Sequence, residues 1–170
     1  LVYPNGALQL SCRKFPTLFA LLLRVFRLDR LIQRPVRSYL MADWDHNSVR
    51  EVDWVIGGCV LLRRKAIEKI DLFDEDFFIF AEDVDINMRG QLQGFKCVYL
   101  PKAKVYHIGT ATVGLYSDRY IYLCKRNDIF VLIRNYSLKL YFKYIWTILH
   151  HQINDIKYFT YRGQGVVLFK

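Results

Sequence analysis

A helix that runs directly into a strand is the feature that most constrains how this chain folds. The segment AEDVDINMRGQLQG (81–94) has acids in its first turn, and Gly94 is suited to end a helix. Its apolar residues fall at helical spacing: Val84, Met88 and Leu92. FKCVYL (95–100) then predicts a strand that Pro101 closes, and VDWVIGGCVLLRR (52–64) predicts an earlier strand broken at a glycine pair. Strand, helix and strand in this order indicate an α/β fold.

The remaining segments predict a short domain with a helical end. AKVYHIG (103–109) predicts a second short strand, and residues 17–28 and about 116–156 predict helices, the latter with a break near Asn135. These strands are too few for a complete doubly wound sheet, so the pattern suits the second half of an α/β domain. We expect one part over residues 1–115 and a helical part over residues 116–170.

Charge is distributed unevenly along the chain. There are 25 Lys and Arg against 16 Asp and Glu, yet seven of the acids lie between Asp71 and Asp85, where no basic residue occurs. The surplus of basic residues elsewhere indicates an anionic neighbour, namely phosphate groups, nucleic acid or an acidic lipid surface. A solvated basic surface explains the surplus equally well.

Three acids crowd the start of the predicted helix, at Glu82, Asp83 and Asp85. A helix N-terminus favours each carboxylate by about 0.3–1 kcal/mol, and capping alone is the ordinary explanation of one such residue. Three in four positions exceed what capping needs, because like charges repel. Beside a run of phenylalanines, such carboxylates could accept a proton from a substrate hydroxyl, bind a hard metal ion or orient a sugar.

Other candidate residues are single side chains with two interpretations each. His107, at the end of a predicted strand, is a metal ligand if the acids fold beside it, and otherwise a structural histidine. Trp54 is a stacking platform or a core residue. The run DWDH (43–46) contains the residue types of a metal site, although an ordinary polar loop is the favoured interpretation.

Several short motifs occur together in this chain. They are W-x-x-G-G at 54–58, an arginine pair at 63–64, F-D-E-x-F-F at 73–78, E-D-x-D at 82–85, the helix-ending Gly94 and the strand that leads to His107. With NGALQLSCRKFP and CKRNDIFVLIRNYS, they extend over roughly residues 1–140. This combination resembles the second half of family 2 glycosyltransferases of the GT-A fold, in their bacterial rhamnosyltransferase-like branch.

The resemblance implies an inverting sugar transfer in a single displacement. Asp83 would be the general base that takes the proton from the acceptor hydroxyl, with Glu82 as the other member of the catalytic acid pair. His107 matches a histidine that in some members helps hold a divalent metal, Mg²⁺ or Mn²⁺, on the donor diphosphate.

The same resemblance implies the substrates. Trp54, Gly57 and Gly58 would line the donor and acceptor pocket, and Asp85 is placed with these substrate-binding residues. The donor would be a nucleotide-sugar, with dTDP-rhamnose suggested by the branch, and the acceptor a lipid-linked or polysaccharide hydroxyl. The reaction would be cytoplasmic, at the inner face of the membrane, and would serve polysaccharide biosynthesis for the cell envelope.

The family's N-terminal, nucleotide-binding half and its D-x-D motif are not visible in the sequence. We therefore expect a partial GT-A fold, an acceptor-side half followed by C-terminal helices, which is inactive when isolated. The alternative is a non-enzymatic module that binds carbohydrate or a membrane surface. No nucleic-acid partner is expected, because the acid cluster opposes one and no RNA- or DNA-binding motif occurs. The amphipathic window 129–149 either packs on the domain or contacts a membrane, and both interpretations stay open.

Overall fold

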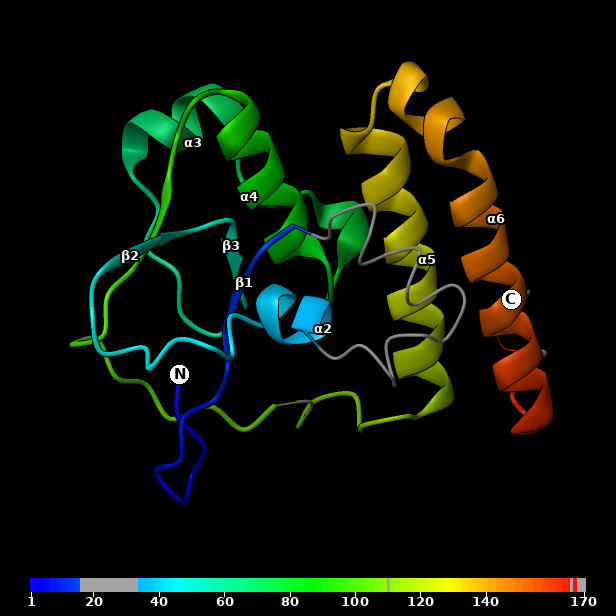
Figure 1. Ribbon diagram of the computed structural model, residues 1–170, viewed down its shortest axis with the longest axis horizontal. Helices are drawn as coiled ribbons and strands as arrows, with labels where there is room; N and C mark the ends of the chain where they lie inside the picture. The colour runs from blue at the N-terminus through cyan, green and yellow to red at the C-terminus, as the bar shows by residue number, and fades with distance from the viewer. Residues whose placement is uncertain (16–33, 110, 166, 168–170) are drawn as a thin grey trace. The chain divides into compact units, whose positions relative to one another are not determined.

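The computed structural model describes residues 1–15, 34–109, 111–165 and 167 (Figure 1). The described residues divide into two compact units, the first formed by residues 1–15 with 34–109 and the second by residues 111–165 with 167. The helix predicted over 17–28 lies outside the described residues.

The first unit contains short strands and four helical segments. In chain order these are β1 (Cys12–Arg13), α2 (Arg34–Tyr39), β2 (Arg50–Val52), β3 (Trp54–Val55), α3 (Arg64–Ile70), the 3₁₀ helix η2 (Glu75–Phe77), α4 (Glu82–Leu92) and β4 (Cys97–Tyr99). The strands pair antiparallel, β1 with β3 and β2 with β4. The predicted order of strand, helix and strand is confirmed by β3, α4 and β4.

The predicted strand over 103–109 is reduced to one bridge. Tyr106 bridges Val2 in parallel, and two backbone hydrogen bonds join the segments, from Val2 N to Val105 O and from His107 N to Val2 O, both at 2.9 Å. Extended backbone pairs only where a neighbour supplies donors and acceptors, and here the neighbour is a single residue. The bridge nevertheless fixes the position of His107.

Helix α4 buries a different face from the predicted one. The buried residues are Asp85, Ile86 and Gly90, while Leu92 is 71% exposed. A Cβ added at Gly90 would lie 3.6 Å from Ile70 Cδ1 of α3, an ordinary van der Waals distance, so this face of α4 packs against α3. Gly94 follows the helix with φ of +82°, the left-handed conformation that glycine adopts without strain. The helix end was thus predicted correctly and its buried face was not.

The core of the first unit joins both strand pairs. Cys12, Met41 and Val52 are buried together, and Trp44, Val55, Cys97 and Tyr99 pack against them. Burial raises the pKa of the Cys97 thiol to about 11, so this cysteine stays protonated and acts as a small apolar residue. The core therefore holds β1, β3 and β4 in the positions from which the candidate site is built.

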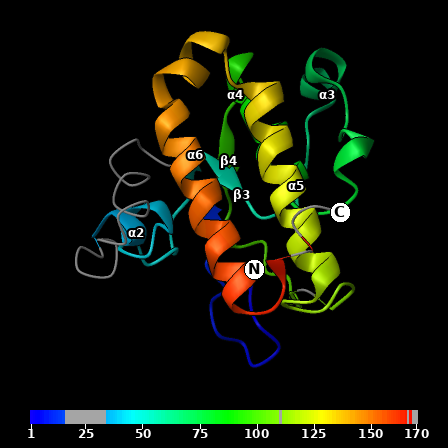
Figure 2. The ribbon, with the colours of Figure 1, turned by 90° about the vertical axis from the view of Figure 1, so that its right-hand side faces the viewer.

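The second unit is described mainly by two helices that lie side by side, α5 (Asp118–Asn135) and α6 (Leu138–Tyr161) (Figure 2). The Ser117 hydroxyl caps α5 by accepting a hydrogen bond from Tyr120 N. The helical segment is interrupted at Tyr136, beside the break that the sequence predicts near Asn135. Ile121 of α5 packs with Phe159 of α6. In the part of the chain that the structure describes, neither helix is apolar over a long enough run to span a bilayer.

Candidate functional site

The Asp83 carboxylate is held by two backbone N–H groups. Oδ2 accepts from Gly57 N at 2.8 Å and Oδ1 accepts from Val84 N at 2.8 Å. Asn87 donates from Nδ2 to the Asp83 carbonyl at 2.7 Å. The contact with Gly57 links the first turn of α4 to the loop after β3, 26 positions away in the sequence. The carboxylate is therefore fixed in place beside the glycine pair, with lone pairs remaining on both oxygens.

Burial changes the proton affinity of both members of the acid pair. It raises the pKa of Asp83, although the hydrogen bonds from Gly57 and Val84 and the charge of Arg13 oppose the shift. It also raises the pKa of Glu82, and the negative charge of Asp83 adds to that effect. Among the described residues, no hydrogen-bond partner reaches the buried Oε2 of Glu82. The pair thus combines one well-held carboxylate with one poorly solvated carboxyl group.

The pKa of Glu82 provides a test of the electrostatic interaction between Glu82 and Asp83. Asp83→Asn removes a neighbouring negative charge, so the pKa of Glu82 is expected to fall but to stay above its ordinary value, because burial is the larger cause. A ¹³C NMR titration of the side-chain carboxyls measures this, and Glu75→Gln, at an exposed residue of η2, is the matched control. An unchanged Glu82 titration in Asp83→Asn would contradict the coupling.

The sign of the stability effect follows from the raised pKa values. The folded state binds protons at Glu82 and Asp83 more tightly than the unfolded state. Their contribution to stability is therefore complete below the unfolded pKa and is lost as pH rises through the folded pKa.

The glycine pair lies between the acids and His107. A Cβ at Gly57 would stand 3.4 Å from Asp83 Cβ and 3.7 Å from Glu82 Oε1, whereas one at Gly58 would stand 3.2 Å from His107 Cδ2. The structure therefore brings together five of the residues predicted from the sequence, at one turn of the first unit: Gly57, Gly58, Glu82, Asp83 and His107.

The space around Gly58 is too small for a larger residue. A Cβ added there would be crowded on two sides, 2.8 Å from Leu1 Cδ1 and 3.2 Å from His107 Cδ2, so Gly58→Ala is expected to displace the His107 ring. Gly57→Ala meets only ordinary contacts and is the matched control. The histidine ring resonances in heteronuclear NMR spectra report the displacement. Equal shifts of the His107 signals in the two variants would contradict it.

The His107 ring is oriented by a side-chain contact. Its Nδ1 lies 2.9 Å from Gln9 Oε1, and in the neutral tautomer with the proton on Nδ1, Nε2 carries a lone pair. Such a nitrogen is a suitable metal ligand. Among the described residues, however, no three His, Cys, Asp or Glu side chains gather so as to hold an ion. A single imidazole does not form a metal centre, so these residues do not complete the predicted metal site.

Two of the predicted substrate-binding residues support the fold instead. Asp85 is 1% exposed and its Oδ2 accepts from Arg89 Nε at 2.8 Å. The same guanidinium donates to the carbonyl oxygens of Ile70 and Leu72. Trp54 is buried in β3, with the Arg13 guanidinium 6.0 Å from its ring centroid. Neither side chain presents a surface to a substrate in this arrangement.

Backbone strain marks the approach to the acid pair, and the sequence does not show it. Phe78, Phe80 and Ala81 have positive φ values of 59°, 72° and 64°. Residues other than glycine adopt this conformation at a cost of about 1–3 kcal/mol each, and such residues cluster at functional sites. Ala81 is the residue directly before α4. The strained turn therefore sets the direction in which the side chains of Glu82 and Asp83 project from the start of the helix.

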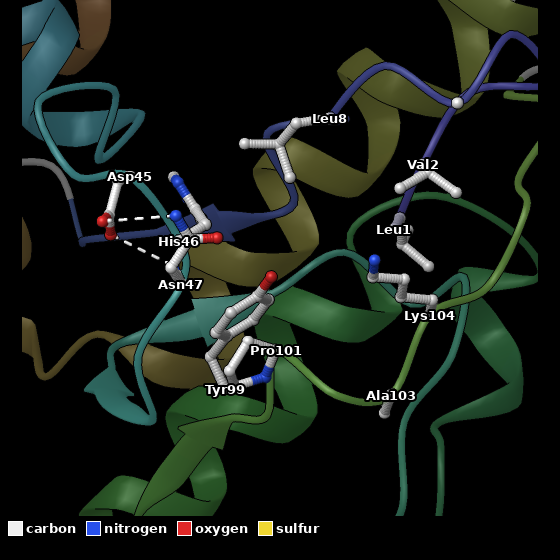
Figure 3. Close-up of a pocket in the computed structure, with 11 residues that line it drawn as sticks. Leu1, Val2, Leu8, Asp45, His46, Asn47, Tyr99, Pro101, Ala103 and Lys104 are labelled. Atoms are coloured by element: carbon white, nitrogen blue, oxygen red, sulfur yellow. Dashed lines mark hydrogen bonds between the residues drawn. The ribbon is translucent and has the colours of Figure 1, made fainter.

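The run 43–46 forms a loop beside a separate cavity. Asp43 pairs with Arg37 at 2.7 Å, and Asp45 Oδ1 accepts from Asn47 N at 3.0 Å. His46 is 3% exposed and stacks on Trp44 with ring centroids 4.3 Å apart. The cavity, about 210 Å³, has Leu1 and Lys104 on one side and the 45–47 loop and Tyr99 on the other (Figure 3). None of the acid pair or the glycine pair lines it.

Comparison with known proteins assigns the chain to a family. Residues 34–162 match the family described as "Glycosyl transferase family group 2", so the chain belongs to that family. Its α/β arrangement, with small sheets and flanking helices, agrees with part of a GT-A domain. No solved structure shows a significant match.

The chain is similar to two proteins that are named rhamnosyltransferases. It is 29% identical over 147 residues to the N-acetylglucosaminyl-diphospho-decaprenol L-rhamnosyltransferase of Mycobacterium tuberculosis, an alignment that covers 74% of this chain and 44% of the relative. It is 32% identical over 56 residues to the rhamnosyltransferase WbbL of Escherichia coli K12, covering 33% of this chain and 21% of that protein. The chain thus spans less than half the length of these relatives.

Proposed function

We propose that this chain forms the acceptor-side part of an inverting glycosyltransferase in which Asp83 is the general base. The observation that supports this proposal most directly is the position of the Asp83 carboxylate, which Gly57 N and Val84 N hold beside the glycine pair. Membership of the glycosyltransferase family supports the reaction type. The strained turn before α4 supports a functional role for this corner of the unit.

In the proposed reaction, an acceptor hydroxyl donates a hydrogen bond to the Asp83 carboxylate. As its oxygen attacks the anomeric carbon, the proton passes to Asp83 and the bond from that carbon to the donor diphosphate breaks. The electron pair of the broken bond leaves with the nucleotide diphosphate. A pKa raised by burial brings Asp83 closer to the range in which a carboxylate is an effective base. Glu82, directly beside it, would orient the acceptor.

The substrates are proposed from the names of the relatives. A rhamnosyl nucleotide donor such as dTDP-rhamnose and a lipid-linked or glycan acceptor follow from two relatives named rhamnosyltransferases. A divalent metal, Mg²⁺ or Mn²⁺, is proposed to assist the reaction, and His107 is its proposed ligand among the described residues. The cytoplasmic face of the membrane is the proposed site of the reaction.

The test is transfer by the complete reading frame that encodes this chain. The protein is incubated with a panel of nucleotide-sugars and candidate acceptors, with and without Mg²⁺ or Mn²⁺, and the anomeric configuration of the product is read by NMR. Inversion with one donor supports the proposal, and retention contradicts it. Binding of glycan without turnover of any donor would favour the alternative, a carbohydrate-binding module.

A further inference from the structure

Helix α6 presents a continuous stripe of exposed apolar side chains. The stripe consists of Leu138, Phe142, Trp146, Leu149, Ile153 and Ile156. At 100° per residue these positions fall within about 80° of the helix circumference. Phe142 is 69% exposed and Trp146 is 81% exposed. A continuous apolar face of this length on a helix is characteristic of an interaction surface rather than of scattered surface residues.

A different face of α6 contacts its neighbour in the second unit. Asp155 Oδ2 pairs with Lys125 Nζ of α5 at 2.7 Å, and Phe159 packs with Ile121. At 100° per residue, Asp155 and Phe159 lie about 140° and about 100° around the helix from the middle of the stripe. The stripe is therefore not the surface by which α6 packs against α5.

The charges around the stripe are basic. Lys139, Lys143 and Lys157 lie along one flank, about 100–140° around the helix from Leu138. The only acid in the α6 sequence is Asp155, which is paired with Lys125. Residues 110–170 contain nine Lys and Arg against three Asp and Glu. The stripe is thus bordered by positive charge.

We propose that α6 lies in the interface of a membrane that contains anionic lipids, with its apolar stripe at the acyl boundary and its lysines at the headgroups. An apolar face with tryptophan, flanked by lysine, is the pattern of helices that lie in the plane of a membrane. Charge complementarity favours this occupant over a second copy of the chain, because the lysines beside the stripes of two copies would repel each other. The binding is independent of sugar transfer, so it is measured without donor or acceptor.

The first experiment is vesicle flotation of the full chain. The probes are vesicles of phosphatidylcholine alone and of phosphatidylcholine with phosphatidylglycerol. Binding to the anionic vesicles is expected to be at least about tenfold tighter, and to weaken with added salt. Failure to bind either vesicle would overturn the proposal, as would equal affinity for both.

Matched variants assign the binding to α6. Phe142→Ser with Trp146→Ser is expected to weaken binding by about a hundredfold or more, because large apolar side chains no longer enter the lipid. The control is Leu61→Ser with Leu92→Ser, two exposed residues of the first unit that should leave binding unchanged. Circular dichroism checks that each variant is folded. Equal losses in the two double variants would contradict a specific role of α6.

The lysines provide a second variant that leaves the apolar stripe intact. Lys139→Gln with Lys143→Gln should weaken binding to anionic vesicles about tenfold or more and leave binding to phosphatidylcholine unchanged. Lys65→Gln with Lys102→Gln, on the first unit, is the charge-matched control. Sedimentation velocity of the wild type tests the competing occupant: a dimer that the Phe142 and Trp146 substitutions abolish would overturn the membrane proposal.

Discussion

Asp83→Asn is expected to lower kcat for sugar transfer by about 10²–10⁴-fold, the usual contribution of a general base. The amide cannot take the acceptor proton, although its oxygen can still accept one of the hydrogen bonds that Gly57 and Val84 donate. Because the proton moves only in the transition state, KM should change little. Initial-rate kinetics with the donor that the panel identifies measure both parameters.

The matched control for this substitution lies in the same acidic segment. Glu75 is exposed on η2, so Glu75→Gln removes one negative charge nearby without touching the glycine pair, and should keep wild-type kinetics. Circular dichroism and thermal unfolding show that both variants fold. Wild-type turnover by a folded Asp83→Asn protein would remove Asp83 from the chemistry.

Asp85→Asn is expected to have its main effect on stability, with a loss of about 3–5 kcal/mol in the free energy of unfolding. Asp85 is almost fully buried and its carboxylate pairs with Arg89, which also donates to the carbonyls of Ile70 and Leu72. Removing the negative partner leaves a partly buried guanidinium without its counter-charge. Denaturant titration monitored by circular dichroism measures the loss.

An exposed ion pair of the same unit is the control for Asp85. Glu51 accepts from Lys96 at 2.8 Å, and both side chains are more than half exposed. Glu51→Gln should therefore change stability far less than Asp85→Asn, because water screens an exposed pair. Similar losses of unfolding free energy in the two variants would show that the Asp85–Arg89 pair does not hold α4 to the C-terminal end of α3.

The comparison of Asp83 with Asp85 shows what sequence reasoning missed. Both acids occupy the first turn of a predicted helix, and both were predicted to be at the site. Their spacing contained one unused signal, since Arg89 lies four residues after Asp85 and such pairs form along a helix. Trp54 also had a signal, because it lies in an apolar run predicted as a strand, where a large aromatic side chain commonly packs in the core. The strained turn at Phe78, Phe80 and Ala81 had none.

The sequence by itself determined the local elements of this protein. It placed the helix, its end at Gly94 and the strand that follows, because capping, glycine conformation and β-propensity act over a few residues. Only the tertiary structure decided which acid faces the glycine pair and which is buried. Residues two positions apart on a helix point about 200° apart. The segments packed on each side, the loop after β3 with Gly57 and α3 with Ile70, therefore assign Asp83 to the candidate site and Asp85 to the fold.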